Sequence, residues 1–170
     1  MKYWIVLWLM LAVAGAQAHD GRVNITGTID DNTCTLSPDS QNFTVEMGQV
    51  SNRQFYHAGD GGAYVLFTIN LEDCGSTASG VSVSFSGAAD SLNPILLALT
   101  GGADSASGVG IALYNGDKTP VAPGDISNLQ PLIPGQATAR LNFYARYVAD
   151  GATVTPGSAN ASATFVLNYA

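Results

Sequence analysis

The sequence predicts an all-β protein, an antiparallel sandwich made of short strands. In several segments apolar residues alternate with polar ones, which is the period of a strand with one face against a core. Glycine, proline and serine mark turns between these segments, and no stretch of ten residues beyond residue 18 has a convincing helical period. Many short strands joined by turns favour a sandwich of antiparallel sheets.

The amino-terminal 18 residues have the pattern of a secretory signal peptide. Lys2 precedes an apolar run over residues 4–13, and Ala16-Gln17-Ala18 matches a signal cleavage site. The run is shorter than the roughly 20 apolar residues that a membrane-spanning helix needs. We therefore expect the mature chain to begin at His19, to form one domain and to have no segment inserted in the membrane.

The charge balance restricts the partners that the chain can have. It has 13 acidic and six basic residues and a net charge of −7. Nucleic acid and anionic membranes both need clustered lysine and arginine, so neither is expected as a partner. The two cysteines, Cys34 and Cys74, are an even number in an exported chain, which predicts one disulfide. Without CxxC spacing or nearby ligands, a redox or metal pair is disfavoured.

The last ten residues, 161–170, predict a strand with one apolar face. Apolar side chains alternate there with Ser162, Thr164, Val166 and Asn168, and the inward set is Ala163, Phe165, Leu167 and Tyr169. Because one residue follows this strand, we expect it to lie at an open sheet edge that something else must cover.

A second strand with one apolar face is predicted over residues 21–29. Gly21, Val23, Ile25, Gly27 and Ile29 share one face. This segment could be an ordinary first strand of the sandwich or an extension that pairs with another molecule. Between the two ends, alternation predicts strands over residues 43–47, 65–71, 81–85, 109–113 and 139–145, with a turn at Asn115-Gly116.

No pattern in the sequence predicts catalysis, a metal site or a cofactor. His57 stands alone and has no GxSxG motif near it. The acidic pairs Asp30-Asp31 and Glu72-Asp73 are adjacent in sequence, so in a strand their carboxylates would point to opposite faces. The glycine-rich segment 101–110 matches neither a P-loop nor a GxGxxG motif. We therefore expect a protein that is not an enzyme.

Several features together resemble the subunits of bacterial chaperone–usher fimbriae, the type 1-like pilins. They are the alternating segment HDGRVNITGTIDDNTC, with Gly27 at its centre and the first cysteine at its end, and the segment FTINLEDC before Cys74. LNFYARYVA and VTPGSANASATFVLNYA follow, with a penultimate tyrosine at Tyr169 and a glycine fourteenth from the end at Gly157. The resemblance covers essentially the whole chain after residue 18.

The resemblance implies an immunoglobulin-like sandwich lacking its seventh strand, which a donor strand from another protein completes. A periplasmic chaperone would first supply that strand and hold the terminal carboxylate at a basic site. An outer-membrane usher would then exchange it for the next subunit's extension. The implied domains are a signal peptide (1–18), a donor extension (19–30) and a pilin domain (31–170).

The implied site has a donor and an acceptor part. The donor residues are Val23, Ile25, Gly27 and Ile29, and those of the acceptor groove and chaperone contact are Gly157, Ala163, Phe165, Leu167 and Tyr169. The chain would pass through the periplasm and then stand in a fimbrium on the cell surface. Its spacing before Cys34 and its NITG run are most similar to minor adaptor subunits. A major shaft subunit and a free-standing secreted immunoglobulin-like domain are the alternatives.

Overall fold

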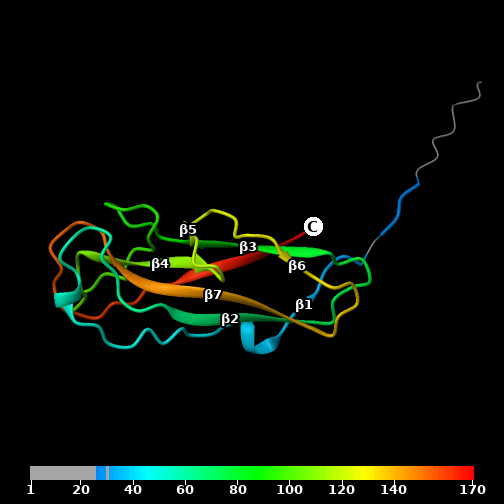
Figure 1. Cartoon of the computed structure of the whole chain (residues 1–170), viewed down its shortest axis with the longest axis horizontal. Coiled ribbons are helices and arrows are strands. Elements are labelled where there is room, and N and C mark those ends of the chain that lie inside the picture. Colours follow the sequence, from blue (N-terminus) through cyan, green and yellow to red (C-terminus); the bar gives the residue numbers. More distant parts are fainter. Residues whose placement is uncertain (1–25, 30) are drawn as a thin grey trace, which may run out of the picture.

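The computed structural model describes residues 26–29 and 31–170 and confirms an all-β fold. Within these residues the strands form two sheets, one ordered β1-β2-β7-β4-β5 and a smaller one ordered β6-β3-β8 (Figure 1). The strands are β1 (Thr35–Leu36), β2 (Val65–Glu72), β3 (Gly80–Gly87), β4 (Val109–Asn115), β5 (Pro120–Val121), β6 (Gln130–Pro131), β7 (Thr138–Ala149) and β8 (Ala163–Tyr169). Two 3-10 helices, η2 (Pro38–Ser40) and η3 (Asn52–Gln54), lie before β2.

The longest strand, β7, forms the centre of the larger sheet. It pairs with β2 on one side and with β4 on the other, both antiparallel. Its side chains alternate as the sequence predicts, so that Leu141, Phe143 and Ala145 are buried in the core. The outward side chains of the same strand include Tyr144 and Arg146, which cover the outer face of this sheet.

An aromatic cluster joins the two sheets. Phe67 and Phe143 come from the larger sheet and lie opposite each other in register, with ring centroids 5.7 Å apart. Phe85 of β3 meets Phe143 edge to face, at 5.1 Å. Aromatic pairs in such arrangements add to the stability that area burial alone provides. The core therefore lies between β2 and β7 on one side and β3 on the other.

The disulfide that the cysteine count predicts is confirmed, and it joins Cys34 to Cys74. Cys34 immediately precedes β1, while Cys74 follows β2, the strand with which β1 pairs. The bond therefore ties the beginning of the folded domain to the larger sheet.

Most of the predicted strands are confirmed. The segments predicted over residues 65–71, 81–85, 109–113, 139–145 and 161–170 are β2, β3, β4, β7 and β8. The turn at Asn115-Gly116 connects β4 to β5, with the Lys118 N–H donating to the Asn115 carbonyl at 2.9 Å.

The strand predicted over residues 43–47 is wrong for this isolated chain. Its side chains do alternate, because Val45 and Met47 are half-buried against the core while Thr44 and Glu46 are exposed. No strand forms, however, because the backbone has no neighbouring strand with which to form a ladder. The alternation reflects contact with the core, and a ladder needs a partner as well.

The second strand with one apolar face, predicted over residues 21–29, is described only in part. Residues 26–29 form no strand and lead away from the body at the end where β1 begins (Figure 1). The side chain of Ile29 is fully exposed. Val23, Ile25 and the predicted signal peptide lie outside the described residues.

Candidate functional site

β8 forms a long edge of the smaller sheet. Along its whole length β8 pairs with β3, from Val81↔Tyr169 to Gly87↔Ala163. In the part of the chain that the structure describes, no strand pairs with the other side of β8. An unpaired edge presents a row of free N–H and C=O groups, which is a template for another strand.

Segment 42–50 lies close to this edge. Its residues make no backbone–backbone hydrogen bond with any described residue. Phe43 of this segment lies 6.5 Å from Phe165 of β8, measured between ring centroids. We call β8 together with segment 42–50 the open edge. One side of β8 has no paired strand, segment 42–50 has no backbone partner among the described residues, and both have apolar side chains packed on the core.

Tyr169 closes one end of the open edge. Its hydroxyl donates a hydrogen bond to the Cys34 carbonyl, with 3.0 Å between the oxygen atoms. Burial raises the pKa of Tyr169 above its ordinary value of 10.0, so the hydroxyl stays protonated and can donate at physiological pH. Since Phe43 meets Phe165 and Cys34 meets Tyr169, the chain after Cys34 runs along β8 in the opposite direction.

The predicted acceptor residues on β8 differ in exposure. Phe165, Leu167 and Tyr169 are half-buried and pack against the core, whereas Ala163 at the start of the strand is exposed. Val166, between them, points to the opposite face and is 56% exposed. The apolar face of β8 is therefore only partly covered, as a strand beside an unfilled edge should be.

Gly157 lies six residues before β8 and is not part of the strand. A Cβ atom on Gly157 would overlap the backbone of residues 104–106, with the nearest atom being the amide nitrogen of Ala106. The next residue, Ser158, donates its N–H to the Asp104 carbonyl at 2.8 Å and accepts from Ala106 at 2.9 Å. Gly157 thus allows two backbones to approach closely, at the loop that leads into β8.

Two residues that the sequence did not assign to this site contact β8. Phe43 was recognised as part of an alternating segment, but its closeness to β8 depends on the tertiary fold. The Cys34 carbonyl was not identified at all, because a backbone acceptor has no signal in the sequence. Gly27, from the predicted donor set, has no atom within 4 Å of the position that a Cβ would take.

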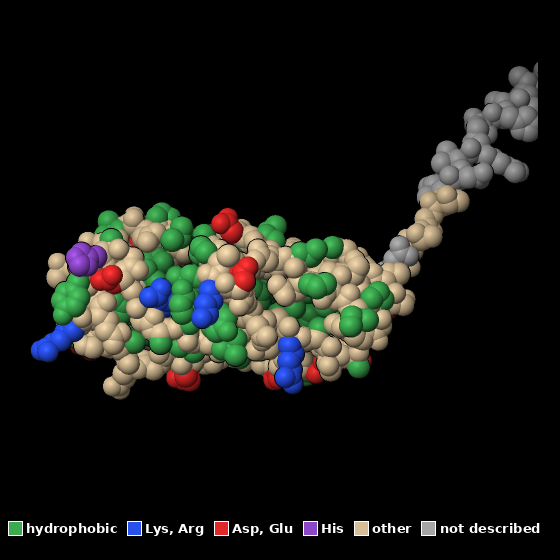
Figure 2. Space-filling view, in the orientation of Figure 1, with side chains coloured by type: hydrophobic (Ala, Val, Ile, Leu, Met, Phe, Trp, Pro, Cys, Tyr) green, Lys and Arg blue, Asp and Glu red, His purple; other side chains and the backbone are tan. Residues whose placement is uncertain are grey.

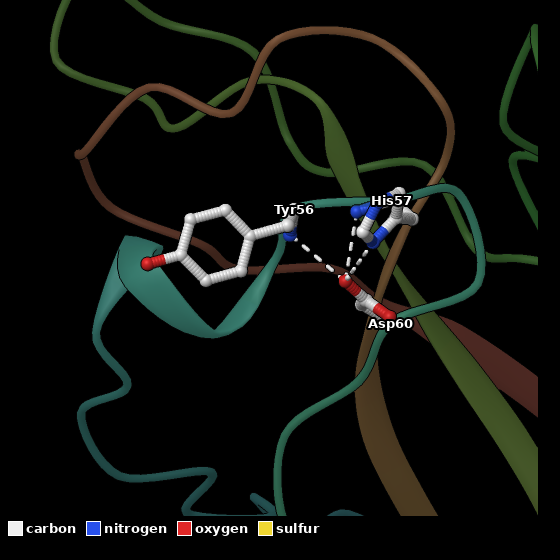
Figure 3. Close-up of polar contacts among 3 residues, drawn as sticks. All are labelled: Tyr56, His57 and Asp60. Atoms are coloured by element: carbon white, nitrogen blue, oxygen red, sulfur yellow. Dashed lines mark hydrogen bonds and ion pairs between the residues drawn. The ribbon is translucent and has the colours of Figure 1, made fainter.

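His57 is part of a turn in which Asp60 is the central acceptor (Figure 3). One Asp60 carboxylate oxygen accepts the backbone N–H groups of Tyr56 at 2.8 Å and His57 at 2.7 Å. Mainly the His57 N–H and then the Tyr56 N–H lower the pKa of Asp60. The imidazole is 87% exposed and lies 3.6 Å from the same carboxylate oxygen. This geometry fixes a loop by hydrogen bonds from carboxylate to backbone.

Of the predicted acidic pairs, Asp30-Asp31 lies partly outside the described residues, and Glu72 of the other pair lies at the end of β2. Glu72 accepts a hydrogen bond from the Ser37 hydroxyl at 2.6 Å, which joins β2 to the segment after β1. Among the described residues, no three His, Cys, Asp or Glu side chains converge as metal ligands would. None of the helices in the described ranges has the length and apolar character needed to cross a membrane.

Residues 23–170 match the family described as Fimbrial protein, and the chain belongs to that family. It is 38% identical over 169 residues to the uncharacterized fimbrial-like protein YcbV of Escherichia coli K12, with 96% of this chain and 97% of that protein covered. It is 41% identical over 158 residues to the probable major fimbrial subunit LpfA of Escherichia coli O157:H7, with coverage of 92% and 88%. Its fold is similar to a chain in the structure of a chaperone–usher pilus, with 25% identity, a TM-score of 0.67 and coverage of 90% and 97%.

These similarities confirm the fimbrial family and the sandwich of immunoglobulin type that the resemblance implied. The chain is a structural subunit of a fimbrium on the cell surface and not an enzyme. A subunit of this kind polymerises with other subunits, so its functional site is a surface that another protein chain meets.

Proposed function

We propose that this subunit is polymerised by donor-strand exchange at the open edge. The extension over residues 19–30 inserts Val23, Ile25, Gly27 and Ile29 into the open edge of the next subunit. The pilin domain over residues 31–170 accepts a strand in the same way. A periplasmic chaperone first fills the edge during transit, and an outer-membrane usher catalyses the exchange.

One observation carries this proposal. Phe43 and Phe165 place segment 42–50 beside β8, and among the described residues no backbone pairing joins the two. A strand inserted between them could form ladders with both and cover Phe165, Leu167 and Tyr169. The fully exposed Ile29 and the empty surroundings of Gly27 fit an extension that does not pack on its own domain.

The energy available from such insertion is large. If each buried apolar side chain contributes about 1.5 to 3 kcal/mol, then Val23, Ile25 and Ile29 together contribute roughly 5 to 9 kcal/mol before backbone pairing and entropy are counted. That range is comparable with the whole stability of a small domain. Insertion of the donor strand would therefore contribute a large part of the stability of the acceptor domain.

The test is the rate at which a synthetic peptide of residues 19–30 displaces the chaperone from its acceptor subunit. We expect a peptide with Gly27→Leu to be slower, because overpacking at a shallow position costs about 1 to 3 kcal/mol. A peptide with Thr28→Leu is the matched control, since it adds the same side chain to the outward face. An equal or higher rate for the Gly27→Leu peptide than for the unchanged peptide would reject the idea that the groove is shallow at position 27. If no peptide displaces the chaperone from any fimbrial subunit of the same organism, the donor assignment is wrong.

The position of the subunit in the fibre has two candidates. The spacing before Cys34 and the NITG run favour a minor adaptor between shaft and tip. The 41% identity to a probable major subunit favours the shaft. Gel densitometry of purified fibres separates the two, because a shaft subunit dominates the protein in the fibre and an adaptor is a trace component.

A further inference from the structure

The outer face of the larger sheet carries a cluster that the open edge does not use. We define the aromatic–basic patch as Tyr64, Tyr114, Lys118, Tyr144 and Arg146. The ring of Tyr64 lies 5.0 Å from that of Tyr114 and 6.0 Å from that of Tyr144. The Lys118 ammonium lies 5.0 Å from the centroid of Tyr64 and 5.5 Å from that of Tyr144. Figure 2 shows basic side chains among hydrophobic ones on the face over β4 and β7.

The two cationic side chains of the patch, Arg146 and Lys118, differ in whether they are bound within the chain. The Arg146 guanidinium donates to the Gly62 carbonyl at 2.7 Å and to the Gly61 carbonyl at 3.0 Å, so it holds the chain before β2 in place. Lys118 is exposed at the turn between β4 and β5 and forms no ion pair with any described residue. The Lys118 ammonium is therefore the charge that this patch offers to a partner.

The distribution of charge in the chain indicates what kind of surface the aromatic–basic patch could bind. Within residues 26–29 and 31–170 the basic residues are Arg53, Lys118, Arg140 and Arg146, and the last three lie on the outer face of the larger sheet or its rim. Over the whole chain 13 acidic residues outnumber six basic ones, which gives the net charge of −7. A basic surface with tyrosines suits an acidic protein surface, because tyrosine and arginine are enriched where interfaces gain most of their energy.

We propose that the aromatic–basic patch binds an acidic surface of a second copy of this chain in the fimbrium. Two patches cannot face each other across a two-fold axis, since the Lys118 ammonium groups would then repel. The contact must join different surfaces of two copies, and a contact of this type extends into an open filament or a ring. The inference rests on the proposed function, and specifically on the shaft position, in which copies of this subunit follow one another along the fibre.

The test uses the lysine content of the chain. Apart from Lys2 in the predicted signal, Lys118 is the chain's one lysine. Treating native fibres with a zero-length carbodiimide should link Lys118 to a carboxylate of another copy, and mass spectrometry of the dimer band identifies the pair. Lys118→Arg keeps the charge but removes the amine, so it should abolish this crosslink without changing the amount of chain in the fibres.

Tyr144→Ser tests the patch with Lys118 still present. It should lower the yield of crosslinked dimer, whereas Tyr56→Ser at an exposed tyrosine outside the patch should leave it unchanged. Raising the ionic strength from about 0.15 M to about 1 M shortens the Debye length from about 8 Å to about 3 Å and should also lower the yield. Fibres that contain the chain but give no Lys118 dimer, or link Lys118 to a different protein, would overturn this inference. Absence of the chain from the fibres would instead contradict the proposed function.

Discussion

The Tyr169 hydroxyl donates a hydrogen bond to the carbonyl of Cys34, at 3.0 Å across a separation of 135 residues. Tyr169 ends β8, one edge strand of the smaller sheet, and Cys34 precedes β1, one edge strand of the larger sheet. This single contact therefore joins the edges of both sheets at one end of the open edge.

Tyr169→Phe removes only this hydrogen bond. We expect a loss of about 1 kcal/mol in the free energy of unfolding, or somewhat more because the carbonyl loses its donor in a half-buried place. Urea unfolding of the subunit bound to its chaperone or to a donor peptide measures the change. Tyr56→Phe is the control. Because Tyr56 is 76% exposed, this variant should have the same free energy of unfolding as the unchanged subunit. Equal values for both variants would show that the contact is not stabilising.

Substitutions at two neighbouring residues of β8 test the two faces of the strand separately. Phe165→Asp places a charge among apolar side chains of the open edge and should prevent capture by the chaperone, leaving a subunit that aggregates or is degraded. Val166→Asp introduces the same charge one residue later, on the exposed outer face, and should leave capture intact. The amount of subunit that copurifies with tagged chaperone measures this. If the Phe165→Asp subunit were captured at the normal level, the assignment of β8 to the acceptor site would be wrong.

Gly157→Ala tests the close approach of two backbones before β8. The added Cβ would overlap the backbone of residues 104–106, so the loop must shift, and overpacking of this kind costs about 1 to 3 kcal/mol. Gly101→Ala is the control, because a Cβ there meets nothing within 4 Å. Thermal unfolding of the two complexes with the same donor peptide should show a lower midpoint for Gly157→Ala alone.

The Asp60 turn should be stable over most of the pH range and weaken only in acid. Hydrogen bonds from the His57 and Tyr56 amides lower the pKa of Asp60 below its ordinary value of 3.8. A carboxylate with a lowered pKa contributes its stabilisation above the unfolded value, and that contribution is lost as the pH falls through the folded value. An NMR titration should show the His57 amide signal changing at a pH below 3.8. In Asp60→Asn this transition should be absent, and a midpoint at or above 3.8 would contradict the assignment.

How much could be predicted from the sequence depended on the kind of contact. Strands such as β2 and β7 were predictable because their alternating side chains meet a core on one face, and that requirement shows in the residue order. Segment 43–47 has the same alternation but forms no strand, because a ladder needs a neighbour that the isolated chain does not supply.

The remaining site features depend on the tertiary fold. The neighbours of Gly157 lie about 50 residues earlier in the chain, and no local pattern connects them. Likewise Tyr64, Tyr114 and Tyr144 belong to three different parts of the sequence, and only the pairing of β7 with β2 and β4 brings them together. Distant contacts of this kind leave no periodic signal in a single sequence.

The disulfide between Cys34 and Cys74 has a mechanical consequence. If the fibre is joined through donor extensions as proposed, tension would enter each subunit at the chain just before Cys34. The two-residue strand β1 alone would peel away under such a load. The covalent bond would pass the load instead to the end of β2, whose ladder with β7 runs from Val65 to Glu72. Under the proposed donor-strand assembly, the pull on one subunit would therefore be carried by the centre of its larger sheet rather than by the two-residue strand β1.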